Sequence, residues 1–158
     1  MAGKSGINPL WKKSDISLVF KKLGERAEWA IVELLKRTGE EFVKIARLEG
    51  NYQDWTGNLR SSIGYVIIRN GSQIVKDFKE SKKEGTDKKT GKAEAERLTR
   101  ELAGTHSTCY VLIGVAGMKY AVFVEAMENK DVLSRAVDKA EDFIRAQSRS
   151  LFNRLTKM

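Results

Sequence analysis

The chain has 158 residues, of which 41% are hydrophobic, and this composition fits one globular domain and excludes an intrinsically disordered chain. A formal net charge of +8 allows contact with nucleic acid or with an acidic protein surface and does not choose between them. One cysteine and one histidine exclude an internal disulfide and a Cys/His zinc site, and we expect no cofactor.

The first segment, residues 1–14, is polar and basic, and we expect it to form a flexible arm. It lacks the apolar stretch of a secretory signal. No apolar run in the chain approaches the roughly 20 residues that a membrane helix requires, so we expect no membrane partner.

A long amphipathic helix is predicted over about 16–48, because apolar residues recur there at intervals of three and four. Ser14 or Ser17 can cap its start, and Gly24 is a candidate point of interruption. Gly50 supplies a stop signal at its end.

Two antiparallel strands are predicted next, at about 62–69 and 72–78, because Asn70-Gly71 between β-branched runs favours a tight hairpin turn. Residues 79–92 contain no apolar residue, and we interpret them as a mobile, lysine-rich loop. A short helix is expected at 93–103.

The C-terminal third predicts a strand at 108–115, with Cys109 as a small core residue. Residues 118–125 fit either a fourth strand or a helical turn. A final amphipathic helix follows, with Asp131 as its N-cap. The fold expected is α+β: an antiparallel sheet of three to four strands, packed on one face by a long N-terminal helix and a C-terminal helix. We expect a single domain over 15–158.

The stretch WTGNLRSSI, residues 55–63, was compared with two kinds of active site. A phosphate-binding loop needs more glycines and a preceding strand, whereas this stretch precedes a strand. A nucleophilic Ser61 or Ser62 lacks an evident base, since His106 lies in another loop, so a hydrolase is the weakest alternative.

Glu125, Glu128 and Asp131 are more typical of helix caps than of a metal site. We expect no catalytic, metal-binding or cofactor-binding residues, and not an enzyme.

Exposed aromatic and basic side chains provide the candidates for contact with a partner. They are Trp11, Trp55, Arg60, Lys82, Lys83, Lys88 and Lys89. Trp29 lies beside the apolar stripe of the first helix and is expected to flank the core. The alternative function is a non-enzymatic nucleic-acid-binding protein that uses the basic region 76–100. Against it, acids are interleaved there and no aromatic residue lies within 79–92 to stack on a base.

Two segments in a fixed order carry a resemblance to a known family: TGNLRSSI at 56–63, then IGV at 113–115 followed by YAVFVE at 120–125. Together they resemble the head–tail joining or tail-completion proteins (neck proteins, minor tail components) of long-tailed bacteriophages, over roughly residues 20–155. The matching positions are Thr56, Gly57, Leu59, Arg60, Ser62, Ile63, Tyr120, Ala121, Val124 and Glu125. The chain departs from the family pattern after Glu125, where Ala126 replaces the usual Gly-Thr, and it lacks a proline before the final helix.

This resemblance implies a structural virion or prophage protein without catalysis, a ring-forming subunit at the head–tail junction. The implied partners are further copies of the chain, other neck proteins, portal-side and tail-tube proteins, and DNA in passing. The implied location is the virion, assembled in the bacterial host cytoplasm. We expect Leu59 and Ile63 to anchor the motif in the core and Arg60 to point to solvent or to a neighbouring subunit.

Overall fold

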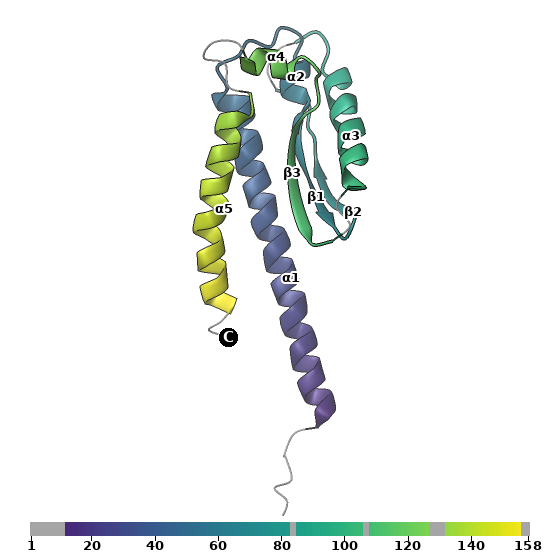
Figure 1. Ribbon diagram of the computed structural model, residues 1–158, viewed down its shortest axis with the longest axis vertical. Helices are drawn as coiled ribbons and strands as arrows, with labels where there is room; N and C mark the ends of the chain where they lie inside the picture. The colour runs from purple at the N-terminus through teal and green to yellow at the C-terminus, as the bar shows by residue number, and fades with distance from the viewer. Residues whose placement is uncertain (1–11, 83–84, 106–107, 127–131, 156–158) are drawn as a thin grey trace, which may run out of the picture.

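The computed structural model describes residues 12–82, 85–105, 108–126 and 132–155. Figure 1 shows a small sheet flanked by helices, with one long helix running past it. The elements are α1 (Lys13–Lys44), the π-helix η1 (Ile45–Glu49), α2 (Asn58–Ser61), β1 (Ile63–Arg69), β2 (Ser72–Asp77), α3 (Lys89–Ala103), β3 (Tyr110–Ala116), α4 (Ala121–Ala126) and α5 (Ser134–Leu155). The predicted α+β class is confirmed.

The sheet has three strands in the order β2-β1-β3, and both pairs are antiparallel. Asn70 and Gly71 have φ values of 49° and 79°, the left-handed geometry that a two-residue hairpin turn requires, so the predicted hairpin is confirmed. Ile67 faces Val75 and Ile68 faces Gln73, which leaves one extra residue in β2 as a bulge.

Both faces of the sheet are covered, contrary to the expected single face. Val66 and Ile68 pack in a cluster with Ala95 and Ala103 of α3, whereas Tyr65 and Ile67 pack with Leu35 of α1. Figure 1 shows α3 on one side of the sheet and α1 with α5 on the other. The cause is visible in β1, an uninterrupted apolar run that has no polar face to turn toward water.

The N-terminal helix starts earlier than predicted and passes through Gly24 without interruption. Neither Ser14 nor Ser17 caps it; Lys12 is the N-cap residue, and its backbone N–H donates to Asp15 Oδ2 at 3.1 Å. The predicted arm is therefore too long at its C-terminal end, because residues 13 and 14 are helical. Residues 1–11 and the predicted N-cap Asp131 lie outside the described residues.

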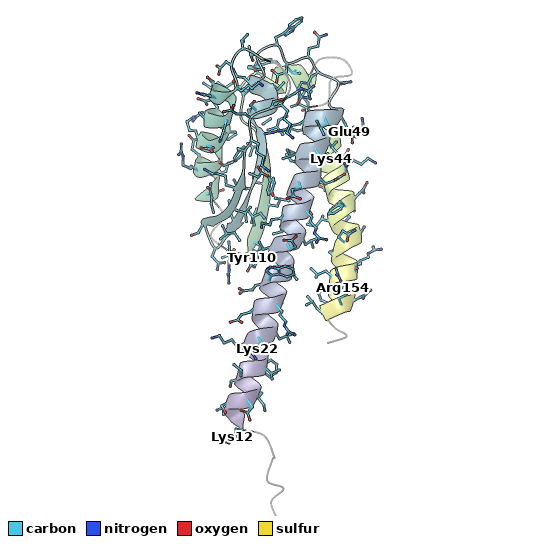
Figure 2. All side chains as sticks on the ribbon, turned by 180° about the vertical axis from the view of Figure 1, so that it is seen from behind. Lys12, Lys22, Lys44, Glu49, Tyr110 and Arg154 are labelled. Carbon is cyan, nitrogen blue, oxygen red and sulfur yellow. The ribbon has the colours of Figure 1, made fainter. Side chains whose placement is uncertain are left out.

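The first part of α1 extends beyond the rest of the protein. We call residues 13–26 the helical extension. Figure 2 shows Lys22 farther along α1 than both Tyr110, at the start of β3, and Arg154, near the end of α5. The first long-range ion pair along α1 that the structure describes joins Glu28 to Arg69 of β1 at 2.6 Å. The extension is exposed throughout except for the half-buried Ile16.

Two other local predictions are corrected, and one that was left open is decided. Residues 121–126 form the helix α4, the helical alternative for this segment, and the sheet of the described residues has three strands. β3 begins at Tyr110, and Cys109 is an exposed turn residue with a φ of 69°, so its assignment to the core is wrong. α3 begins at Lys89, which shortens the predicted loop by its last turn.

Candidate functional site

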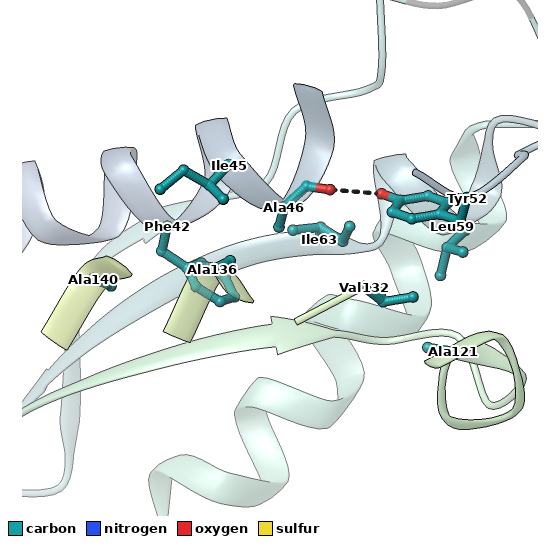
Figure 3. Packing of buried hydrophobic residues seen from close by; sticks show 10 residues of the cluster. All are labelled: Phe42, Ile45, Ala46, Tyr52, Leu59, Ile63, Ala121, Val132, Ala136 and Ala140. Atoms are coloured by element: carbon teal, nitrogen blue, oxygen red, sulfur yellow. Dashed lines mark hydrogen bonds between the residues drawn. The ribbon is translucent and has the colours of Figure 1, made fainter. Parts of the chain in front are cut away.

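The two segments that carry the family resemblance meet at one end of the sheet. Leu59 and Ile63 from the first segment and Ala121 from the second lie in one buried cluster, with Val124 packed against it. Figure 3 shows Ile63 beside the end of the N-terminal helix, with Leu59, Val132 and Ala121 beyond the helix ends. We call residues 54–63, 120–125 and 132–134 the motif corner. The predicted anchoring of Leu59 and Ile63 in the core is confirmed.

Asp54 organises the first turn of the motif corner. Its carboxylate accepts the backbone N–H groups of Gly57 at 3.0 Å, Leu59 at 3.4 Å and Arg60 at 2.7 Å. These N–H groups open the short helix α2 and have no partner within it, so an acidic acceptor satisfies them. Gly57 has a φ of 81°, which explains the glycine of the motif. Sequence reasoning missed Asp54, although an acid three residues before Gly57 is a capping signal.

Arg60 does not point to solvent or to a neighbouring subunit, and its assignment as a partner contact is wrong. Its side chain is 4% exposed and lies over the ring of Tyr52, 4.3 Å from the ring centroid. Its Nη2 donates to the carbonyl oxygen of Tyr52 at 3.0 Å and more weakly to that of Gly50 at 3.4 Å. Arg60 therefore holds the chain between η1 and α2, because its Nη2 reaches two backbone carbonyls at once.

Tyr52 supplies the ring on which Arg60 lies. Its hydroxyl donates to the carbonyl oxygen of Ala46 at 2.9 Å, the bond drawn in Figure 3. Burial raises the pKa of Tyr52 to about 12, against the opposing effect of the Arg60 charge. The tyrosine thus stays neutral at physiological pH and closes the end of α1 over the core.

Ser61 and Ser62 are both fully buried. Ser61 Oγ accepts the backbone N–H of Ser81 at 3.0 Å, and Ser62 Oγ donates to the carbonyl of Leu59 at 2.8 Å. The backbone carbonyl of Ser62 accepts the N–H of Gly117 at 3.1 Å. Both serines serve the packing of the motif corner, and neither side chain is accessible to a substrate.

The lysine-rich segment is anchored to the motif corner rather than free. Asn58 donates through Nδ2 to Asp87 at 3.2 Å and accepts the N–H of Gly91 at 2.7 Å. Hydrogen bonds from Thr90 and Asn58 lower the pKa of Asp87. A side chain on Gly91 would meet the carbonyl oxygen of Asn58 at 2.1 Å, so α3 starts tight against α2. The described residues of this segment near the motif are therefore hydrogen-bonded to it, and the mobility of the loop stays a prediction.

Glu125 links α4 to the start of α5. Its carboxylate accepts the N–H groups of Val132 at 3.2 Å, Leu133 at 2.8 Å and Ser134 at 2.8 Å, and the Ser134 hydroxyl. Burial pushes the pKa of Glu125 up, but these hydrogen bonds outweigh it and leave the pKa lowered. Glu125 is thus a helix cap, as predicted, and Glu128 and Asp131 lie outside the described residues. Among the described residues no cluster of acidic, histidine or cysteine side chains could hold a metal ion.

The predicted partner-contact residues differ in exposure. Trp55 is 84% exposed at the motif corner, and Lys82 and Lys89 are exposed, whereas Lys88 is half-buried beside Gly57. Trp11 and Lys83 lie outside the described residues. Trp29 is largely exposed rather than part of the core edge.

The basic region 76–100 is partly neutralised by acids of its own. Lys76 pairs with Glu96 at 3.3 Å, and Arg97 pairs with Glu94 at 3.0 Å and Glu101 at 2.6 Å. These pairs reduce the positive potential that the region presents to a phosphate backbone.

Exposed apolar side chains lie at the end of the molecule that carries α4. Val122 is 74% and Phe123 is 71% exposed, and Tyr120 is partly exposed. Figure 1 shows α4 and α2 together at this end, opposite the helical extension. We call Trp55, Tyr120, Val122 and Phe123 the apolar tip.

Comparisons of the chain with protein-family models, with curated proteins and with solved structures find no match. Among the described helices, none combines the length and the apolar character needed to cross a membrane.

Proposed function

We propose that this protein is a structural, ring-forming subunit of a tailed bacteriophage or prophage, located at the head–tail junction and without catalytic activity. The observation that carries the proposal is the motif corner. The two segments that resemble the neck proteins are distant in sequence, yet their apolar residues share one buried cluster with the start of α5.

The chemistry of the motif residues supports a scaffolding role. The motif residues act on the backbone of their own chain. Gly57 adopts a left-handed turn, and the side chains of Arg60, Ser62 and Glu125 form hydrogen bonds with backbone groups. A motif of this kind preserves the shape of a subunit, which an assembly of identical subunits needs at every interface.

The distribution of exposed apolar surface also supports assembly. Eight exposed large apolar side chains lie at the helical extension and the apolar tip, which are at opposite ends of the molecule. Contiguous exposed apolar patches mark surfaces that meet other proteins. Two such patches on one subunit suit contacts to different neighbours.

The test is a deletion of the gene from the phage or inducible prophage that encodes it, followed by electron microscopy of the lysate. We expect filled heads and separate tails in place of joined particles, with joining restored by the gene supplied from a plasmid. Infectious, normally tailed particles from the deletion strain would contradict the proposal.

A further inference from the structure

The helical extension carries an apolar face that no described residue covers. Ile16, Phe20, Leu23 and Ala27 are spaced by four, three and four residues, which places them along one side of the helix. Phe20 is 68% exposed and Leu23 is 40% exposed. The same spacing continues through Ala30 and Leu34, which lie beside the last turns of α5. The extension therefore prolongs a helix-packing seam beyond the end of its own partner helix.

A complementary groove lies on another side of the same chain. Its volume is about 450 Å³, and it opens between α5 and β3 over a floor made by α1. Gly39 of α1 and Gly114 of β3 line it, and the rings of Tyr65 and Phe42 lie directly against these two glycines. Val137, which is partly exposed, and Ile144 of α5 form an apolar wall.

Two polar features of the groove bear on what could fill it. Among the described residues that line it, Glu141 is the only charged one, and it forms an exposed ion pair with Arg145 of the next turn at 3.4 Å. The hydroxyl of Tyr110, also a lining residue, is buried and has no hydrogen-bond partner among the described residues. An occupant with a hydroxyl and basic groups beside an apolar face would pair with Tyr110 and give Glu141 a second partner.

The extension has this chemistry. Its charged residues are Lys13, Asp15, Lys21, Lys22, Glu25 and Arg26. The basic residues outnumber the acids, so two extensions side by side would bring like charges together, whereas the groove offers Glu141. Ser17 supplies a hydroxyl on the same segment.

The extension cannot reach the groove of its own copy. The floor of that groove is formed by residues 35–42 of the same continuous helix. Phe20 lies about 20 Å along the helix axis from Leu35, at 1.5 Å per residue. Figure 1 shows α1 running on without a bend away from α5 and the sheet. The occupant must therefore come from another molecule.

We propose that the helical extension of one copy docks in the α1–α5–β3 groove of the next copy, with Phe20 and Leu23 entering the groove. The inference rests on the proposed function, for which it identifies the contact between subunits. Because the contact joins two different surfaces, each copy has one extension and one groove to offer. Repetition of the contact builds a ring when the rotation closes and a filament when it does not.

The first experiment measures the mass of the full-length protein by light scattering over a range of concentrations. We expect species larger than a dimer, and at least about tenfold weaker association for Phe20→Glu and for Val137→Glu, one on each side of the contact. Leu18→Glu is the matched control, since Leu18 is also exposed but lies about 200° around the helix from Phe20. Circular dichroism checks that each variant is folded.

The second experiment uses a short bismaleimide cross-linker in a Cys109→Ser background, which removes the only native thiol. The pair Leu23→Cys with Ile144→Cys should give a ladder of dimers, trimers and larger species. The pair Glu25→Cys with Ile144→Cys is the control, because Glu25 lies on the opposite side of the helix from Leu23, and it should give little product.

Four outcomes would overturn the inference. The protein could stay monomeric and uncross-linked at high concentration, or Leu18→Glu and Phe20→Glu could weaken association equally. Leu23→Cys alone could give efficient dimers, or a monomer could bind anionic vesicles in a way that depends on Phe20. Dimers from Leu23→Cys alone would show two extensions pairing with each other. The vesicle result would assign the basic apolar extension to a lipid surface.

The failure of this inference can be separated from failure of the proposed function. If purified Phe20→Glu assembles normally while the gene deletion still separates heads from tails, the groove contact is wrong and the neck function stands. If the cross-linked ladder forms as expected but deletion leaves normal particles, the contact stands and the neck function is wrong.

Discussion

Glu125 shows how one carboxylate of the motif joins two elements of the fold. It accepts three backbone N–H groups around the start of α5 and a hydroxyl from Ser134. These bonds require the ionised carboxylate as acceptor. The pKa of Glu125 is lowered by them in the folded state, although burial alone acts in the opposite direction.

We predict that Glu125→Gln destabilises the protein by about 1–2 kcal/mol near neutral pH and flattens its acid dependence. A depressed folded-state pKa stabilises the protein fully above the unfolded value, about 4.3 for glutamate, and this stabilisation is lost as the pH falls through the folded value. The difference in free energy of unfolding between wild type and variant should therefore shrink from pH 6 to about pH 3. Urea denaturation at several pH values measures it.

Glu25→Gln is the matched control for this experiment. Glu25 is exposed on the helical extension, so the same isosteric change there should leave the stability and its pH dependence close to wild type. If Glu125→Gln gives a difference that is constant over the whole pH window, the glutamate does not act as an ionised cap.

At the residue scale, the sequence was informative about which residues matter and less so about the direction in which they point. Leu59 and Ile63 were placed correctly, because large apolar residues in a motif before a strand have few alternatives to the core. Arg60 was misplaced, because a buried arginine depends on carbonyls of Tyr52 and Gly50 that only the folded chain brings near. Asp54, by contrast, was a local signal, because it accepts N–H groups only three to six residues further along the chain.

At the scale of elements, the long helix α1 approaches the sheet through a glycine. A side chain on Gly39 would lie 2.5 Å from ring atoms of Tyr65 in β1, too close for any packing. Gly39 therefore sets the distance between helix and sheet. Gly24, in the same helix, has no such neighbour within 4 Å.

We predict that Gly39→Ala and Gly24→Ala have effects of opposite sign. Alanine favours helix over glycine by about 1 kcal/mol, so Gly24→Ala should raise the helix content and not lower the stability. Gly39→Ala should destabilise the protein by about 1–3 kcal/mol, because the overpacking against Tyr65 exceeds the gain in helix propensity. Far-UV circular dichroism and urea denaturation measure both. Equal stabilisation by the two substitutions would contradict the close approach of α1 to β1.

The elements themselves were largely predictable, and their arrangement was less so. The Asn70-Gly71 turn and the apolar period of α1 are local signals, and both were read correctly. The covering of both sheet faces is a tertiary property, although the unbroken apolar run of β1 already indicated it. Residues 118–125 were ambiguous because a short apolar run fits a strand and a helical turn equally.

At the scale of the whole molecule, α1 has two parts, one packed in the core and one exposed. From Leu35 onward its buried side chains belong to the core, whereas residues 13–26 have no packed neighbour among the described residues outside the helix itself. Phe20 and Leu23 continue the apolar spacing of Ala27, Ala30 and Leu34 toward the N-terminus. Such spacing shows that one face of the helix is apolar. It does not show whether residues of the same chain cover that face.

We predict a gradient of amide hydrogen exchange along α1 that depends on protein concentration. In dilute solution, amides of residues 14–26 should exchange rapidly by local fraying, and those near Phe42 should exchange only through global unfolding. Above the concentration at which copies associate, protection should rise in the extension and in the groove residues Val137 and Ile144, and nowhere else to the same degree. Mass spectrometry of peptides after deuterium labelling at two concentrations measures this. Strong protection of the extension at every concentration would mean that it is covered within a single copy, and protection in the extension alone would exclude the groove as its site.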